Sequence, residues 1–329
     1  MVGCYRFGRY FAHIAEQLQD ADLTVVNVEG SMGGMGDLGY TGYPSFNTPP
    51  SLLSALKACG VDMLTLANNH SLDEYFDGLK GTMDNCDKYG LAFVGAARTR
   101  QERETPVVKE IEGISVGFLN YTMNTNGMEK YCSEDAVQFG IWYARNASFK
   151  RDVAALRGAG ADVVVAYMHW GTEYELKPDS SQKSLARRLT EAGVDVIIGS
   201  HPHVVQKPIE WLSAKLDDGS THRCLCVYSL GNFLSNQPRR LRDSGIVFEF
   251  TIQETRENEF EITSPRYIPT YYWRRGSETK GLTIRIVSVG EWLDKRPEGM
   301  DDDSYGRLKQ VWRQTRELLG EKVAVMAAN

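Results

Sequence analysis

The chain has 329 residues, of which 42% are hydrophobic, so it is long enough for a sizeable core in one large domain or two small ones. Its formal net charge of -6 argues against a nucleic-acid-binding protein, because such proteins usually carry a basic face. Its longest apolar runs are of strand length, far short of the roughly 20 residues that a membrane helix needs, and no signal-peptide pattern opens the chain.

Four segments share one pattern: an Asp, an apolar run rich in β-branched residues, and then polar residues. Such runs indicate strands buried on both faces. The segments are 21–30, 60–70, 160–171 and 193–203. Because the runs have nearly equal lengths, we expect the polar residues that follow them to lie at equivalent strand ends: Glu29, Asn69, His169 and His201.

Helical patterns at 51–59, 147–157 and 180–192 come before strand segments, and each ends near a glycine that can cap a helix. The alternation of helix and strand predicts an α/β fold. If the strands run parallel in one sheet, their carboxyl ends share an edge, which is where open α/β sheets bind ligands.

The remaining elements point to a layered molecule. Residues 107–121 predict a hairpin around Glu112 and Gly113, and the chain becomes strand-rich after residue 222, which suggests a second sheet packed on the first. A final amphipathic helix is expected at about 303–323. The sequence shows no linker or repeat, so we predict a single domain over residues 1–329.

The polar residues at the strand ends are of types that bind divalent metals: imidazole, carboxylate and amide. Each has an ordinary alternative, since a lone strand-end histidine usually packs and an Asn tolerates turns. Their joint occurrence predicts a shared metal site, whereas His13, in a helical pattern, and His222, in a polar turn, are expected to have no chemical role. The predicted set is Glu29, Asn69, His70, His169, His201 and His203.

At these residues the chain resembles the capsule-synthesis CapA family of the calcineurin-like metallophosphoesterase superfamily. The resemblance implies a four-layer αββα sandwich with a two-metal centre of manganese, iron or zinc. It also implies a link to poly-γ-glutamate capsule synthesis or export, in a family whose members are usually membrane-anchored or exported. The matching stretches are ADLTVVNVEG, YTGYPSFNTPP, LTLANNHSLD, VVVAYMHWGTEYE, VIIGSHPHVVQ and YSLGNFLSNQ, within residues 21 to 237.

Carried over residue by residue, the resemblance makes Glu29 the carboxylate that bridges two metals. One metal position would be completed by Asn69, His169 and His201. His203 would bind the other metal.

The resemblance also assigns residues around the metals. His70 would contact the substrate or act as general acid, and Asn232 in the GNF stretch would orient a ligand or make a turn. The basic cluster of Arg239, Arg240 and Arg242 could meet an anionic polymer or phosphoester, although a solvated loop is the alternative.

One part of the superfamily pattern is absent, since no Asp-x-His precedes Glu29 and Phe11 stands where the Asp would be relative to His13. We therefore expect one well-formed metal site and one incomplete site. There are two explanations. Either the chain is truncated at its N-terminus relative to the family and lacks the first strand, or the protein works with one metal. Because the sequence shows no signal or anchor, we expect a soluble chain and leave its localisation open.

Three functions remain open at this point. The chain could be a metal-dependent hydrolase of phosphoesters or γ-linked amides, inactive if the second site is needed. It could be a non-catalytic metal-binding component of a polymer synthesis or export complex, or a purely structural metal fold. Open ligand positions favour the first two, because structural zinc sites are closed and commonly rich in cysteine.

Overall fold

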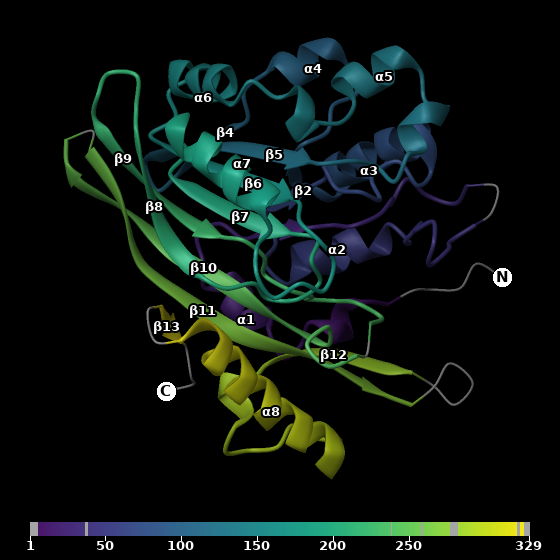
Figure 1. Cartoon of the computed structure of the whole chain (residues 1–329). Helices are drawn as coiled ribbons and strands as arrows, with labels where there is room; N and C mark the ends of the chain where they lie inside the picture. Colours follow the sequence, from purple (N-terminus) through teal and green to yellow (C-terminus); the bar gives the residue numbers. More distant parts are fainter. Residues whose placement is uncertain are drawn as a thin grey trace. The chain divides into compact units, whose positions relative to one another are not determined.

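A computed structural model describes residues 6–36, 39–237, 239–257, 259–276, 282–320 and 323–325 (Figure 1). The chain divides into two compact units. Unit 1 comprises residues 1–8, 15–170 and 192–194, and unit 2 comprises residues 9–14, 171–191 and 195–329. Both units contain helices and strands, which confirms the predicted α/β class. The single domain over residues 1–329 stays a prediction.

Unit 1 contains two groups of three strands. The first is a parallel sheet in the order β1 (Val25–Asn27), β2 (Met63–Thr65), β3 (Ala92–Val94). In the second, β5 (Ile114–Thr122) pairs antiparallel with β4 (Val108–Ile111) and parallel with β6 (Val163–His169). These strands confirm the predicted hairpin and three of the four predicted strand segments.

The predicted strand segments do not all share one parallel sheet, because β1 and β2 lie in a different sheet from β6. The strand β3, which the sequence patterns did not predict, pairs with the free side of β2, and β5 occupies the equivalent position beside β6.

The repeated Asp at the start of the predicted strands has a structural role. Asp62 Oδ2 accepts a hydrogen bond of 3.0 Å from the backbone N–H of Thr24, beside β1. Asp162 Oδ2 accepts one of 2.8 Å from the backbone N–H of Ser115 on β5. A carboxylate that binds the backbone of the neighbouring strand helps to fix the strand register, and so the heights at which the strands end.

The helices of unit 1 have recognisable caps. The side chains of Thr99 and Ser133 accept backbone N–H groups at the starts of two helices, and Gly90, with a φ of 68°, ends another in the left-handed conformation. The helices are α1 (Ala15–Gln19), α2 (Ser51–Ala58), α3 (Tyr75–Tyr89), α4 (Arg100–Glu104), α5 (Glu134–Phe139) and α6 (Phe149–Gly158). Helices α2 and α6 confirm predicted segments, whereas α3 had no counterpart in the sequence-based prediction.

Unit 2 contains the strand-rich region expected after residue 222. One group has the order β7 (Val196–Ser200), β9 (Thr221–Val227), β8 (Ile209–Lys215). A second sheet has the order β10 (Ser244–Arg256), β11 (Glu259–Arg275), β12 (Thr283–Ser288), and β13 (Ala324–Val325) pairs with β11. Strand β7 confirms the fourth predicted segment.

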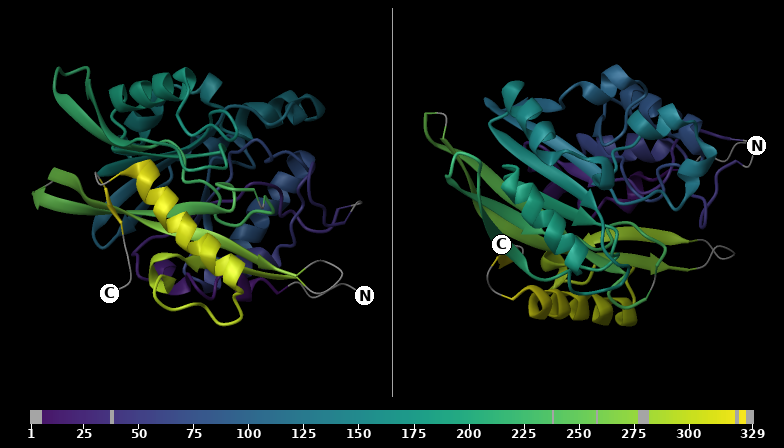
Figure 2. Two further views of the ribbon diagram at one scale, coloured as in Figure 1. Left: turned by 60° about the horizontal axis from the view of Figure 1, so that its bottom comes forward. Right: turned by 45° about the horizontal axis from the view of Figure 1, so that its top comes forward.

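Two helices belong to unit 2, and both confirm predictions: α7 (Ser180–Glu191) and α8 (Asp302–Leu319). Figure 2 shows α8 lying along one face of the sheet of β10, β11 and β12. Its buried Leu308 and Val311 belong to a hydrophobic cluster with Trp273 of β11 and Val287 of β12. None of the helices in the described part of the chain is long and apolar enough to cross a membrane.

The helical pattern expected around His13 is wrong. Helix α1 begins two residues later, and His13 forms an isolated β-bridge with Val287, with its carbonyl accepting a hydrogen bond from Ser288 N–H. The ring of Trp292 packs edge-on against the imidazole at a centroid distance of 5.3 Å. Burial lowers the pKa of His13, and the nearby Arg285 guanidinium lowers it further. Pairing with β12 and packing on Trp292 thus decide the conformation here rather than helical propensity.

Candidate metal centre

In unit 1, a buried side chain, that of Asn68, links the loops that carry Glu29 and Asn69. Both follow strands of the first sheet, β1 and β2. Between them, the side chain of Asn68 donates a hydrogen bond of 2.7 Å to Val28 O and accepts one of 3.0 Å from the backbone N–H of His70. Asn68 is fully buried, so it fastens the loop after β2 to the residue that precedes Glu29.

His169 is the last residue of β6 and is 2% exposed. Its backbone pairs with Thr122 of β5, and its carbonyl accepts a hydrogen bond from Met123 N–H. A histidine held in this way at a strand end presents its ring with little freedom.

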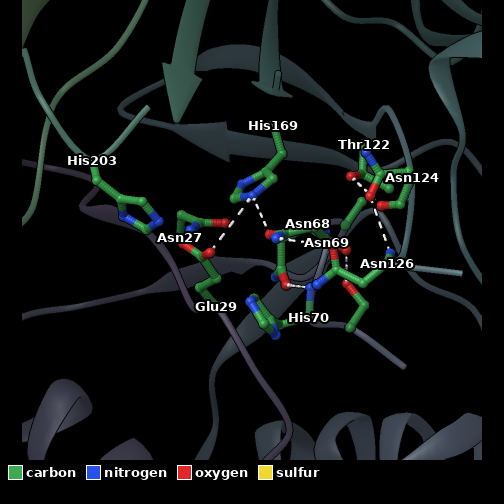
Figure 3. Close-up of polar contacts among 12 residues, drawn as sticks. Asn27, Glu29, Asn68, Asn69, His70, Thr122, Asn124, Asn126, His169 and His203 are labelled. Carbon is green, nitrogen blue, oxygen red and sulfur yellow. Dashed lines mark hydrogen bonds and ion pairs between the residues drawn. The ribbon is translucent and has the colours of Figure 1, made fainter. Parts of the chain in front are cut away.

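The three side chains meet in unit 1 with His169 in the middle (Figure 3). His169 Nε2 lies 2.7 Å from Asn69 Oδ1 and 3.9 Å from Glu29 Oε1. Asn69 is 5% exposed, and its amide nitrogen donates a hydrogen bond of 3.4 Å to Asn126 Oδ1. That contact turns the amide oxygen of Asn69 toward the imidazole.

These donor atoms fit a divalent metal ion. Zinc binds nitrogen and carboxylate oxygen at about 2.0–2.2 Å, so two donors on one ion lie about 3 to 4 Å apart. The distance of 3.9 Å from His169 Nε2 to Glu29 Oε1 lies within that range, and the distance of 2.7 Å to Asn69 Oδ1 lies slightly below it. One imidazole, one amide and one carboxylate suit manganese, iron or zinc, and do not single out one of them.

His70 is placed beside this group and is oriented by a carboxylate. Its Nδ1 lies 2.8 Å from Asp73 Oδ2, and both side chains are largely buried. The same oxygen accepts a hydrogen bond of 2.7 Å from Phe46 N–H, and the Phe46 ring meets the imidazole edge-on at 4.6 Å. An ionised Asp73 therefore favours a proton on Nδ1 of His70, which makes Nε2 the nitrogen suited to proton exchange.

His201 and His203 lie in unit 2, directly after β7. Both have positive φ values, 96° and 58°, and their ring centroids are 6.1 Å apart. Such backbone is costly for a residue with a Cβ, and it occurs mostly where surrounding contacts enforce it, often at functional sites. His203 Nδ1 lies 2.9 Å from Asn232 Oδ1. Metal binding by His201 and His203 stays a prediction.

The predicted substrate-binding residues also belong to unit 2. Asn232 is 8% exposed, and its amide nitrogen donates a hydrogen bond of 2.8 Å to the carbonyl of Arg242. Arg239 and Arg240 are exposed, and Arg240 borders a recess that it shares with Asp243 and Arg307. Substrate binding by Asn232, Arg239 and Arg240 stays a prediction.

The model of the bacterial capsule synthesis protein PGA_cap family matches residues 2–237. The chain belongs to this family. It is 30% identical over 213 residues to the PGA biosynthesis protein CapA of Bacillus subtilis, covering 64% of this chain and 52% of that protein. It is 27% identical over 263 residues to the capsule biosynthesis protein CapA of Bacillus anthracis, covering 75% of this chain and 59% of that protein.

The capsule synthesis relatives are longer than the region they share, since the chain spans between half and three fifths of their length. Among solved structures, the calcineurin-like phosphoesterase YfkN from Bacillus subtilis aligns with 82% of this chain and 75% of its own, at 15% identity and a TM-score of 0.41.

Three supporting residues of this family member were missed by the sequence analysis. Asp73 follows His70 by three residues, a spacing that could have been noticed within LTLANNHSLD. Asn120 is a polar residue within the apolar strand β5, and its buried amide accepts a hydrogen bond of 2.7 Å from Ala67 N–H. Asn126 lies in an irregular loop, where no periodic pattern could have identified it.

Proposed function

We propose that the protein is a metal-dependent hydrolase that acts on a phosphoester or a γ-linked amide in poly-γ-glutamate or capsular polymer metabolism. The observation that carries the proposal is the position of His169 Nε2 beside both Asn69 Oδ1 and Glu29 Oε1, next to the oriented His70. A metal ligand set next to a proton-transfer group is the usual arrangement of a metallohydrolase.

In this proposal, Glu29, Asn69 and His169 hold the metal, and His201 is their fourth ligand on the basis of the sequence pattern. His203 belongs to a second, incomplete metal position. A divalent ion, when bound, polarises a phosphoryl or carbonyl group and makes water a stronger nucleophile at neutral pH.

His70 supplies the proton transfer. With Nδ1–H held by Asp73, the imidazolium form of His70 can give its Nε2 proton to the leaving oxygen or nitrogen as its bond breaks, and the neutral ring that remains keeps its proton on Nδ1. Burial of both side chains excludes water from the pair, which strengthens the contact between His70 and Asp73 and preserves the ring orientation. Asn232, Arg239 and Arg240 are the proposed contacts to the substrate.

The link to polymer metabolism comes from the names of relatives. Two are capsule or PGA biosynthesis proteins, and a third, from Mycobacterium tuberculosis, is described as a probable polyglutamine synthesis accessory protein. These names leave room for a non-catalytic role in a polymer synthesis or export complex. They do not separate cleavage of the polymer from support of its assembly.

Metal content and turnover, measured on the same preparation, separate the two roles. The chain is stripped of metal, reloaded with Mn²⁺, Fe²⁺ or Zn²⁺, and analysed for bound metal. It is then assayed with a generic phosphodiester and with a γ-glutamyl peptide. Turnover that needs metal and falls in a His70→Ala variant supports the hydrolase. Bound metal without turnover of either substrate supports the non-catalytic component, and two tightly held metals per chain contradict the incomplete second site.

A further inference from the structure

A stacked row of three side chains in unit 2 contains an arginine that the proposed function does not use. The guanidinium carbon of Arg242 lies 3.2 Å from the ring centroid of Tyr174. The Tyr174 ring in turn stacks on His203 at 6.0 Å, with an interplanar angle of 28°. We infer that Arg242 binds an oxyanion group of the substrate, a carboxylate or a phosphate, at a position beside His203. The inference rests on the proposed function for the identity of the ligand as a substrate.

Tyr174 is held in place by its backbone. Its φ is 70°, and its N–H donates a hydrogen bond of 2.7 Å to the carbonyl of Pro202, between the two histidines of the turn. The ring is 36% exposed, so one face supports Arg242 while part of the edge reaches solvent. Tyr174 therefore forms a platform that keeps a fixed relation to the His201–His203 turn.

Arg242 is also fixed at its backbone. Its carbonyl accepts a hydrogen bond of 2.8 Å from Asn232 Nδ2, and Asn232 Oδ1 lies 2.9 Å from His203 Nδ1. Two sets of contacts thus link Arg242 to His203. The guanidinium is linked through the ring of Tyr174, and the main chain is linked through the side chain of Asn232. An arginine held twice in this way loses less conformational entropy when it binds an anion.

The carboxylate next to Arg242 in the chain is engaged elsewhere. Asp243 makes two hydrogen bonds with Arg307 of α8, of 2.7 and 2.6 Å, and is 7% exposed. Within the described residues, no carboxylate or carbonyl accepts a hydrogen bond from the Arg242 guanidinium. Its charge is therefore not neutralised by the protein, and stacking on a ring leaves the N–H groups at its edge directed to the side, where they can meet an oxyanion in a bidentate manner.

The other two arginines of the basic cluster are placed differently. Arg239 and Arg240 are exposed, and the recess that Arg240 borders contains the carboxylates of Asp243 and Asp303. These two carboxylates balance the two arginines of the recess, Arg240 and Arg307, so its lining offers no excess positive charge to an anion. Arg242 has no such neighbour in the contacts of the described residues, so within the basic cluster it is the better candidate for anion binding.

Binding to the metal-free chain tests the inference without requiring turnover. Inorganic phosphate and a γ-glutamyl tripeptide are titrated separately by calorimetry into the full chain in the presence of EDTA. We expect Arg242→Gln to weaken binding of at least one of them by about 10-fold or more, the usual effect of losing a charge-assisted hydrogen bond. Arg242→Lys restores the charge but not the planar fork, so it should recover only part of the affinity.

Variants of the platform and a matched control complete the design. Tyr174→Phe keeps the ring and should bind like the wild type, whereas Tyr174→Leu should weaken binding. Arg223→Gln is the control, because Arg223 also stacks on an aromatic ring, that of Trp211, at 4.6 Å. Unfolding temperatures of all variants establish that they are folded.

The outcomes are distinguishable. Loss of phosphate binding alone identifies a phosphate as the anion, and loss of tripeptide binding alone identifies a carboxylate. The inference is overturned if the wild type binds neither probe, or if Arg242→Gln binds both as the wild type does. If the metal-loaded chain hydrolyses nothing while Arg242→Gln still weakens binding, the proposed hydrolase fails and the anion site stands.

Discussion

Asp73 holds His70 through a contact of 2.8 Å between Oδ2 and Nδ1, and the same oxygen accepts the backbone N–H of Phe46. The carboxylate thus joins the loop that carries Phe46 to the candidate proton donor. This pair gives His70 one favoured ring orientation and keeps a proton on Nδ1, so that the imidazolium holds its second proton on Nε2, where a general acid can give it to the leaving group.

Replacement of Asp73 by Asn should reduce turnover while metal binding persists. The Asn oxygen can still accept from Phe46 N–H, but the amide no longer stabilises a proton on His70 Nδ1. We expect kcat to fall about 10- to 100-fold, the usual range for the loss of such a supporting contact. Steady-state kinetics and metal analysis of the same sample provide the measurement. An unchanged kcat, or a parallel loss of metal, would remove His70 and Asp73 from the mechanism.

His169 should be the residue on which metal affinity depends most. It lies between Glu29 and Asn69, so His169→Ala removes the central donor of the group. We expect metal affinity to fall by about 100-fold or more, and by less for Asn69→Ala, whose neutral amide is the weaker ligand. Titration with Mn²⁺ and Zn²⁺ gives the affinities.

The matched control for this experiment is His222→Ala. His222 is paired at 3.7 Å with Asp195 in unit 2 and was predicted to have no chemical role. Its replacement should leave the affinity of the chain for both metals as it is. Equal losses in the His169 and His222 variants would argue that the titration reports general destabilisation rather than a site.

Asn120 should contribute strongly to the stability of the fold, because its side chain forms hydrogen bonds with buried backbone groups. Its oxygen accepts from Ala67 N–H, and its amide nitrogen donates to Tyr167 O at 3.2 Å. Asn120→Ala leaves the buried backbone groups unpaired, so we expect the free energy of unfolding to fall by about 2 to 4 kcal/mol. Asn85→Ala is the control, because Asn85 makes one part-buried bond, to Met32 O, and should cost about 1 kcal/mol. Urea unfolding measures both, and equal losses would contradict the role given to Asn120.

The strands were predictable because the apolar runs that form them are long and uniform. Val163–His169 is a continuous buried strand, so its periodicity identified both the element and the polar residue at its end. The same reasoning indicated Glu29 and Asn69, which lie beside His169 in unit 1. The partition into sheets was not predictable, because the choice of partner, such as the pairing of β3 with β2, depends on contacts distant in sequence.

The supporting residues could be predicted only in part. Asp73 was accessible through its spacing from His70, whereas Asn126 reaches Asn69 across 57 positions of the chain. His13 shows the opposite failure, since a local helical pattern was overridden by pairing with Val287. Local sequence thus specifies the elements and the residues at their ends, and tertiary contacts decide which side chains orient them.

The pH dependence of stability should contain a contribution from His13. Its pKa in the folded chain lies below the ordinary value of 6.5, mainly through burial. Between that lowered value and 6.5, the unfolded chain binds more protons at His13 than the folded chain does. The free energy of unfolding therefore falls as the pH drops through this window, and His13 makes no such contribution above it.

His13→Phe keeps a ring against Trp292 and removes the titration. We expect the variant to lose less stability than the wild type between about pH 7.5 and pH 5.5, measured by urea unfolding. Arg285→Gln should act in the same direction but more weakly, because it removes only the smaller cause of the lowered pKa. A His13→Phe chain that loses as much stability as the wild type over this range would show that His13 does not contribute.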